Sequence, residues 1–505
     1  MLAHSDDIKF AGDYNLPSIH IHSHSNTGFT NEEDGVNIQS LVAEMNIFEG
    51  INKNSVTGTL VILDSINLIG NLPIQGTERL SFKLSTPGAH EFGHIIDCSE
   101  ETGHPMHVYK LTDKKQLNEG TCSYVLHFCS REFLRNLRTK VSEAFTGTID
   151  EMVTKILADK DYLDSKRTLF YQKTGNQDKI VIPNMRPFKA IEMLAKRALA
   201  DQTESSSAGY HFYQTTKGFH FRSFESMCVN AYGQPRQVKQ EFNYMPINLR
   251  DPQITDIGRH RGQLAAGDKI LHDLTSVEDY RFINNFHDVA MNQAAGTYAH
   301  RVITHNLFNK SYKESNYHYH NRFQQTKHTD GPNPAVVDTP VDFDNKGVSD
   351  YPESRVTVMP TTQYTHGEKT GAFGIDVEQD GITEASIISQ RAAVEAGTRL
   401  KLTVKGQSYL EPGDLIQFNI LSVENKVISE GAVDPHFSGR YIISKIRHRV
   451  TNDEYIQVLE CVKDSVFNAY TSDGESSYQG HKLPREYSVS KDISEFDNTG
   501  KGPHR

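Results

Sequence analysis

The sequence predicts an α+β protein dominated by β structure, with two small β-barrels joined by a mixed α/β middle region. Three observations support this prediction. Short runs of alternating apolar and polar residues fill residues 1–148 and return within residues 381–465. Between them, residues 149–380 contain helical spacing and a stretch rich in proline and glycine. Residues 466–505 form a polar tail with little apolar surface to bury.

The first barrel is expected to contain six short strands separated by turn residues. They are predicted at 18–22, within 36–51, and at 58–63, 79–84, 106–111 and 124–128. Short strands at this spacing are typical of a barrel or a sandwich. Apolar residues at helical spacing from Phe133 to Val141 predict a flanking helix after Ser130.

The middle region is expected to contain two helices and a hairpin. Thr148 and Glu151 form a capping box that starts the first helix. The second helix is predicted to begin at Pro187 and to end at Ala200, since proline is favoured at a helix start. The segment 210–223 has a Lys-Gly turn between two aromatic runs, which predicts a hairpin that can pack on a barrel.

The second half of the chain is predicted to return to β structure after a connection. Ser276 is a candidate helix start, residues 330–364 are expected to be an extended connection, and a helix is expected at 387–396. The strands of the second barrel are predicted at 400–404, 415–420, 440–446 and 455–462, the last two pairing across a turn at 452–453.

Composition indicates an ordinary soluble protein. The 505 residues allow roughly two to four domains. A net charge of −11 argues against electrostatic wrapping of nucleic acid, because that requires clustered cations. The start of the chain lacks a basic region followed by an apolar run, so neither secretion nor membrane insertion is expected. The five cysteines contain no CxxC pair and are expected to be reduced and mostly buried.

One motif suggests an enzyme. The run from His90 to His94 matches HExxH, in which two histidines one helical turn apart bind zinc and the adjacent Glu91 acts as general base. Gly93 disfavours the required helix by about 1 kcal/mol, and the third ligand would have to be Glu100. A zinc metalloprotease that uses His90, His94 and Glu100 is therefore the alternative to a structural protein.

The context of this motif favours a loop. The predicted strands on either side end at Leu84 and begin at Met106, so HEFGH lies in an excursion of roughly 20 residues, long enough to contact a neighbouring molecule. His20, His22 and His24 alternate along a predicted strand and could form a metal-binding row on one of its faces, but a solvated strand face also explains them. His318 and His320 could bind a metal in the same way, although no third ligand lies near them in the sequence.

Other catalytic signatures are missing from the sequence. It contains no GxxxxGK[ST], no GxGxxG after a strand and no GxSxG, which favours a structural protein without cofactor, metal or catalytic residues. A glycan-binding tail module is a second alternative. That module would have to stack sugars on tyrosine, because the chain has 22 Tyr and no Trp.

Three regions of the chain resemble the baseplate hub proteins of contractile-tailed, T-even-like myovirus bacteriophages. The first is the strand 56–64 followed by the turn 71–76, and the second is the hairpin entry 208–215. The third and strongest is the C-terminal block, which comprises 410–414, 438–443 and 459–464. Together the three regions span roughly residues 15 to 465, and the match is one of pattern and order.

This resemblance implies a structural virion protein of the tail baseplate, synthesised in the cytoplasm of the bacterial host. Two tail-tube-like barrels per subunit would form a pseudo-sixfold ring in a homotrimer. The ring would adapt the hexameric tail tube to the trimeric spike. The implied partners are the tail tube protein, the spike or tail lysozyme protein and the baseplate wedge proteins. DNA would pass through the channel without specific binding, helped by an acidic lumen that repels phosphates, and no membrane contact is implied.

Overall fold

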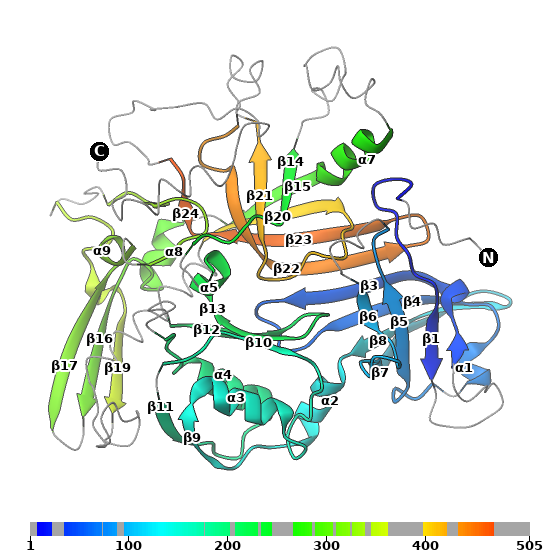
Figure 1. The fold of residues 1–505 in the computed structure, drawn as a ribbon, viewed down its shortest axis with the longest axis horizontal. Helices are drawn as coiled ribbons and strands as arrows, with labels where there is room; N and C mark the ends of the chain where they lie inside the picture. Colours follow the sequence, from blue (N-terminus) through cyan, green and yellow to red (C-terminus); the bar gives the residue numbers. More distant parts are fainter. Residues whose placement is uncertain are drawn as a thin grey trace.

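Most of the described chain folds into β-strands that pair in one large sheet and several small ones (Figure 1). The computed structural model describes residues 8–22, 35–72, 74–87, 95–175, 177–201, 208–230, 234–244, 266–284, 288–306, 310–323, 326–338, 345–361, 397–421 and 433–468. Strands outnumber helices in these ranges, which confirms the prediction of a β-dominated fold. The expected helix at 387–396 and nearly all of the polar tail lie outside them.

The N-terminal strands follow the predicted order and share one core. Arg79–Leu84 shows why they form: its residues alternate strictly between partly exposed and buried positions. The elements are β1 (Ile19–His22), β2 (Val36–Asn37), β3 (Val42–Gly50), β4 (Thr57–Asp64), β5 (Arg79–Leu84), β6 (Ile96–Cys98), β7 (Met106–Asn118) and β8 (Thr121–Cys129), with a 3-10 turn at Gln39–Leu41 and α1 at Leu68–Asn71. They pair in the order β3-β4-β8-β7-β5-β1-β2, with β6 on β5.

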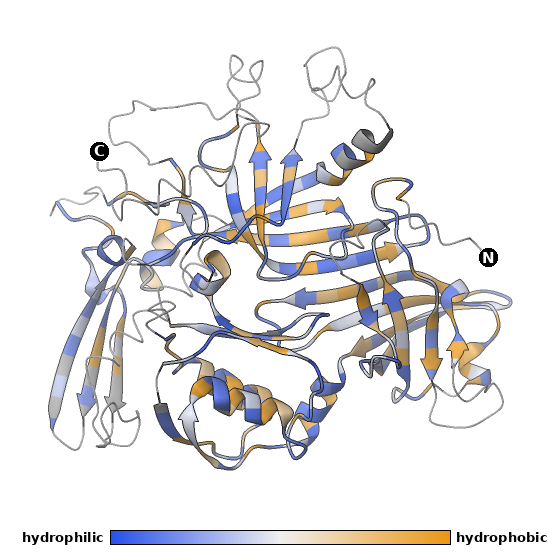
Figure 2. Cartoon of the chain, in the orientation of Figure 1, coloured by the Kyte–Doolittle hydropathy of each residue, from blue (hydrophilic) through white to orange (hydrophobic). Residues whose placement is uncertain are grey.

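The C-terminal strands also surround a core of their own. They are β14 (Gln240–Tyr244), β15 (Val277–Asn284), β20 (Thr398–Lys405), β21 (Leu415–Ile420), β22 (Gly439–Thr451) and β23 (Tyr455–Lys463). They pair in the order β15-β20-β23-β22, with β21 on β22 and β14 on β21. Figure 2 shows polar and apolar residues alternating along these strands, as the sequence predicts for half-buried strands.

The expected helix start at Ser276 is wrong. Strand β15 begins at the next residue, because Tyr280 and Phe282 alternate on one face and pack against the C-terminal core. Burial of these two rings outweighs the local helix signal. Both β14 and β15 come from the predicted middle region and yet pair with C-terminal strands.

Strand β3 pairs with β22 and thereby joins the two sets of strands. The pairing is antiparallel and runs from Glu44 opposite Thr451 to Gly50 opposite Lys445. The described strands therefore form one 14-stranded sheet that extends from β15 to β2. In these residues neither end of the sheet closes as a regular barrel, although a bridge between Asn243 and Ser276 returns β14 to the start of β15.

The middle region has a separate core and packs beneath the sheet. Its elements are α2 (Arg131–Arg138), β9 (Ala144–Thr148), α3 (Ile149–Ala158), β10 (Leu169–Tyr171), β11 (Gln177–Val181), α4 (Pro187–Ala195), β12 (Tyr210–Gln214), β13 (Phe219–Ser223) and α5 (Phe224–Cys228). The capping box at Thr148 and the hairpin of β12 and β13 are confirmed. Helix α4 ends before the predicted Ala200, which instead bridges to Thr174.

The hairpin of β12 and β13 packs on the main sheet. Tyr213 of β12 and Phe224 of α5 share a buried cluster with Ile51, Ile442 and Val462 of the two sets of strands. The hairpin therefore covers part of the sheet at the point where its two halves meet.

A small sheet stands beside the main body (Figure 1). Its order is β17-β16-β19, and the expected extended connection at 330–364 contributes one of these strands. The elements of this part are α8 (Val289–Ala294), β16 (Ala299–Asn306), β17 (Ser311–His318), α9 (Tyr319–Phe323), β18 (Asn333–Pro334), a 3-10 turn (Pro352–Ser354) and β19 (Val356–Thr361), and β24 (Ser465–Val466) pairs with β18. Helix α7 (Ala266–Thr275) instead contacts β14 and β20 of the C-terminal strands (Figure 1).

The cysteines agree with the sequence prediction. All five cysteines are free and four of them are buried. No helix in the described ranges is both long enough and apolar enough to cross a membrane.

Gly58 of β4 tests the packing of the N-terminal core. A Cβ atom there would lie 2.1 Å from the Phe128 ring and 2.4 Å from the carbonyl oxygen of Asn46. We expect Gly58→Ala to lower the free energy of unfolding by about 1–3 kcal/mol through overpacking, as measured by urea denaturation. The control Leu63→Ala, on the same strand but 42% exposed, should cost less than about 1 kcal/mol. Equal effects of the two changes would contradict this packing.

Candidate functional site

The zinc hypothesis depends on residues that are not described. His90, Glu91 and His94 lie outside the described ranges, so their assignment stays a prediction. Glu100 is described, and its carboxylate lies 3.1 Å from Nε of Arg79 in an ion pair. Among the residues that the structure places, no group of three His, Cys, Asp or Glu side chains has the geometry to hold a metal ion.

A short strand divides the excursion between Leu84 and Met106. Strand β6 pairs with β5, with Cys98 opposite Phe82, so the loop that contains HEFGH is much shorter than the expected 20 residues. Sequence reasoning missed β6 because three residues are too few for a periodic pattern. Burial raises the pKa of the Cys98 thiol to about 12, which keeps it protonated and unsuited to bind a metal.

The other histidine pairs lie on strand β1 and at the junction of β17 with α9. His20 and His22 share the partly exposed face of β1, with ring centroids 6.4 Å apart, and His24 lies outside the described residues. Both ring nitrogens of His320 are engaged, Nε2 with the carbonyl oxygen of Val336 at 2.7 Å and Nδ1 with the Ser349 hydroxyl at 2.6 Å. These contacts give His320 a structural role.

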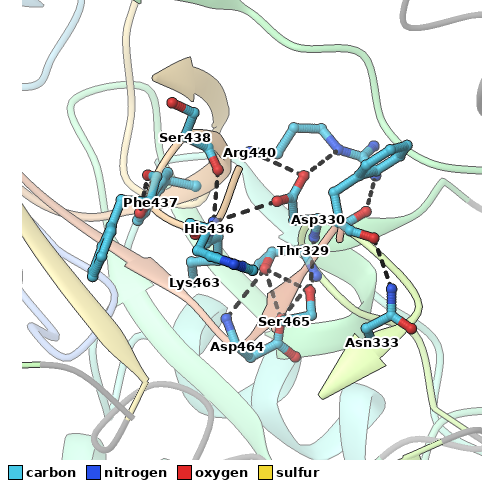
Figure 3. A network of polar contacts seen from close by, with 12 residues as sticks. Thr329, Asp330, Asn333, His436, Phe437, Ser438, Arg440, Lys463, Asp464 and Ser465 are labelled. Carbon is cyan, nitrogen blue, oxygen red and sulfur yellow. Dashed lines mark hydrogen bonds and ion pairs between the residues drawn. The ribbon is translucent and has the colours of Figure 1, made fainter. Parts of the chain in front are cut away.

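A group of buried charges lies where the segment between β17 and β19 meets the ends of β22 and β23. We call this group the polar junction, and Figure 3 shows its side chains converging on one another. It comprises His328, Thr329, Asp330, Arg440, Lys463, Asp464 and Ser465. The segment 328–334 thereby lies against the ends of β22 and β23 and is held by β24.

Lys463 is the central cation of the polar junction, and only 1% of its side chain is exposed. Its ammonium group donates to the carbonyl oxygens of His436 and Ser438, each at 2.8 Å, and lies 3.4 Å from Oδ2 of Asp330. Burial lowers the pKa of Lys463, and the charge of Asp330 opposes this shift without cancelling it.

Asp464 holds the other side of the same segment. Its Oδ1 accepts hydrogen bonds from the backbone N–H and the hydroxyl of Thr329, at 2.9 and 2.6 Å. Its Oδ2 lies 2.7 Å from Nδ1 of His328. Burial by itself would raise the pKa of Asp464, but His328 and Thr329 outweigh it and the pKa lies below its ordinary value. The pKa of His328 is correspondingly raised, because Asp464 outweighs the lowering effect of burial.

Two glycines allow the segment 328–334 to lie close to β22 and β24. A Cβ atom at Gly439, where φ is +128°, would lie 2.1 Å from Oδ2 of Asp330. A Cβ atom at Gly331 would lie 2.4 Å from the carbonyl oxygen of Val466. Both positions therefore require glycine.

The sequence contained a signal for this junction that was not interpreted. The segments 438–443 and 459–464 belong to the block that carries the family resemblance, and they supply Arg440, Lys463 and Asp464. Adjacent charges directly after a buried apolar strand indicate a buried ion pair, but their partner Asp330 lies 133 residues away from Lys463 and cannot be found from spacing.

The pairing of β3 with β22 creates a second polar group with two different faces. Towards the core, Glu49 and His448 are each 1% exposed, with 3.6 Å between the carboxylate and Nε2. Nδ1 of His448 lies 2.6 Å from the Tyr455 hydroxyl. The opposite face of β3, β22 and β23 carries partly exposed polar side chains, and we call it the open face.

Charges on the open face form compact pairs. Glu44 contacts Nη2 of Arg449 at 2.9 Å and Nη2 of Arg447 at 3.3 Å. Glu460 contacts Lys445 at 2.8 Å and Arg399 at 3.8 Å. This face can therefore present a polar surface to a large neighbour without a cavity or a catalytic group.

Comparison with known proteins gave structural matches only. No family model and no curated protein matches the chain. It is similar to the 43 kDa tail protein of prophage MuSo2 from Shewanella oneidensis, with 9% identity, a TM-score of 0.46 and coverage of 90% of this chain and 100% of that one. It is also similar to a tail protein from Neisseria meningitidis MC58. That match has 9% identity and a TM-score of 0.47, and it covers 89% of this chain and 97% of that one.

A third match is the Escherichia coli c3393 protein, described as a component of the type VI secretion system with structural similarity to the T4 tail proteins gp27 and gp5. It shows 8% identity and a TM-score of 0.35, and the match covers 85% of this chain and 74% of that one. The structural neighbours are thus tail proteins and a related secretion component, as the family resemblance predicts. All three TM-scores are below 0.5, so the function proposed below is argued from the chain's own residues.

Lys463 tests the polar junction. We expect Lys463→Met to lower the free energy of unfolding by about 3–5 kcal/mol, because it leaves Asp330 buried without its central cation. Adding Asp330→Asn should recover part of the loss, since it removes the unpaired charge. The exposed Lys401 on β20 provides a control, Lys401→Met, with little expected effect. A similar stability for both lysine variants in urea would contradict the role of the junction.

Glu225 lies on α5 beside the polar junction, and its raised pKa makes the stability of the folded protein depend on pH. Burial raises its pKa to about 7, although the nearby cations His328 and Lys327 oppose the shift. Between pH 4.5 and 7 the folded state keeps this proton while the unfolded state loses it, so stability falls as pH rises. Glu225→Gln should become more stable than the wild type across this window, by about 1–3 kcal/mol at neutral pH.

The measurement is urea denaturation at several pH values. Glu119→Gln, at the exposed turn between β7 and β8, should follow the wild-type profile. Parallel profiles for wild type and Glu225→Gln would exclude a protonated Glu225 in the folded protein.

Proposed function

We propose that the chain is a structural virion protein, the central hub of a phage tail baseplate, and that it acts as a homotrimer. The pairing of β3 with β22 carries this proposal, because it fixes two β units in one sheet. Three such subunits place six similar units around a threefold axis. A ring of this kind matches a hexameric tail tube on one side and a trimeric spike on the other.

The two β units have comparable construction. The N-terminal unit surrounds a core that includes Ile47, Leu60 and Phe128, and the C-terminal unit surrounds one that includes Leu402, Phe418 and Leu459. Each core is formed mainly by antiparallel strands, and strands such as β4 and β20 have buried residues at every second position. In the proposed hub each unit acts as a tail-tube-like β-barrel that is completed in the assembly.

The division of the chain follows from this proposal. Residues 1–148 form the first unit, 149–380 the middle region, 381–465 the second unit and 466–505 the tail. Strands β14 and β15 join the second unit although they precede residue 381, because they pair with β21 and β20. The polar junction then fastens the middle region to the second unit through Asp330 and Lys463.

The open face supplies the surface that lines the channel in this proposal. It is partly exposed, it lies on both β units, and its side chains are mainly polar. It carries paired charges of both signs rather than the purely acidic lining expected from the net charge of −11. DNA would pass along this face without specific binding, and no catalytic residue is required.

The proposed partners follow from the ring. The tail tube protein would dock on one end, the spike or tail lysozyme protein on the other, and baseplate wedge proteins around the outside. The protein would be assembled in the host cytoplasm and would remain in the virion. In this proposal the HEFGH motif contacts a neighbour rather than binding zinc.

Mass measurement in solution tests the proposal. We expect the purified chain to have three times its monomer mass of 57.0 kDa by light scattering, and particle images to show threefold or pseudo-sixfold rings. A monomer at high protein concentration would contradict the hub. Metal analysis of the same sample tests the alternative: stoichiometric zinc that is lost in His94→Ala would exclude a purely structural role.

A further inference from the structure

We propose that Glu44 and Glu460 mask the cations of the open face, so that DNA slides past a surface that would otherwise hold it. This inference deepens the proposed hub function and rests on it for the role of the open face. The partner is double-stranded DNA, recognised through its phosphates alone. The masking itself can be tested on the soluble chain, whatever its oligomeric state.

The first mask is Glu44 of β3, which lies between two arginines of β22. Its Oε2 accepts from Nε and Nη2 of Arg449 at 3.0 and 2.9 Å, and its Oε1 accepts from Nη2 of Arg447 at 3.3 Å. Both arginine side chains are 43% exposed, whereas Glu44 is 23% exposed. The cations therefore lie nearer the solvent, and the single acid lies beneath them.

Arg447 is also positioned over an aromatic ring. Its guanidinium lies 6.0 Å from the ring centre of Phe48, which Lys53 approaches from another direction at 5.2 Å. The same ring thus holds two cations at the surface of the sheet. If Glu44 lost its charge, Phe48 and the hydrogen bond from Nε of Arg447 to Oδ1 of Asn46 at 2.8 Å would keep Arg447 in place, with Nη2 released from its carboxylate partner.

The second mask repeats this arrangement on β23. Glu460 contacts Lys445 of β22 at 2.8 Å and Arg399 of β20 at 3.8 Å. Lys445 is 45% exposed and Glu460 only 21% exposed. One acid again contacts two cations from neighbouring strands, of which Lys445 lies nearer the solvent and Arg399 is only 26% exposed.

These contacts matter because arginine binds phosphate in the same way as it binds carboxylate. A guanidinium offers a planar set of donors that matches either group. Each cation that neutralises a DNA phosphate releases counterions and strengthens binding at low salt. The pKa of Glu44 lies below its ordinary value, since Asn46 and the two arginines outweigh the effect of burial, so this acid stays ionised.

The experiment compares DNA binding of the full-length wild type with that of Glu44→Gln/Glu460→Gln. Fluorescence anisotropy of a short labelled DNA duplex is measured at low and at physiological salt. We expect the double variant to bind at least about tenfold more tightly at low salt, with a salt slope steeper by about 2–4. Wild-type binding should stay weak.

The control is Glu143→Gln/Glu353→Gln, which changes the net charge equally. Its two acids pair with Lys155 in the middle region and with Arg301 of the small sheet, not with residues of the open face. DNA binding by the mask variant that is no tighter than binding by this control overturns the proposal. Adding Arg447→Gln and Arg449→Gln to the mask variant should abolish the gain, and a gain that persists overturns the assignment to the open face.

Folding and oligomeric state are measured on the same samples. If the double variant does not fold, Glu44→Gln alone is judged by the same comparison with Glu143→Gln. A monomer whose mask variant gains DNA binding would overturn the hub and support the masking. A trimer whose mask variant gains nothing would support the hub and overturn the masking.

Discussion

The antiparallel pairing of β3 with β22 is the constraint on which the rest of the structure depends. It joins residues about 400 positions apart in the chain, with Glu44 opposite Thr451 and Gly50 opposite Lys445. Its register decides which side chains enter the core and which reach the surface. A slip by one residue would bring Glu44 into the core and Ile47 to solvent. The buried contact between Glu49 and His448 reinforces this register, because both polar side chains would lose their present environment in any other alignment.

The polar junction has a related role between the middle region and the C-terminal strands. Buried ion pairs contribute little net stability, because desolvation offsets their attraction, but they penalise any arrangement that separates the partners. Lys463 and Asp464 are adjacent, and they hold opposite sides of the segment that contains Thr329 and Asp330. The small sheet, whose strands β16 and β17 precede this segment and whose strand β19 follows it, is therefore attached in one position. Such rigidity suits a subunit whose function depends on where its surfaces lie.

Much of the fold could be predicted from the sequence because most strands are half-buried. Strands β5, β20 and β23 alternate clearly between buried and exposed residues, and the pattern located each of them within a few residues. The capping box at Thr148 located a helix start in the same local way. The failures occurred where local signals were short or misleading. Strand β6 is too short for a pattern, and Ser276 resembled a helix start although burial of Tyr280 and Phe282 favours a strand.

The sequence by itself determined the β-dominated class, the order of most strands and the hairpin at 210–223, since side-chain periodicity is a local property of the backbone. Only the tertiary structure decided that the two β units share one sheet. It alone brought Asp330 to Lys463, and Glu44 to Arg447 and Arg449. The physical reason is that periodicity shows which face of a strand is buried but not which strand lies beside it. That choice depends on packing between distant segments, which no local pattern records.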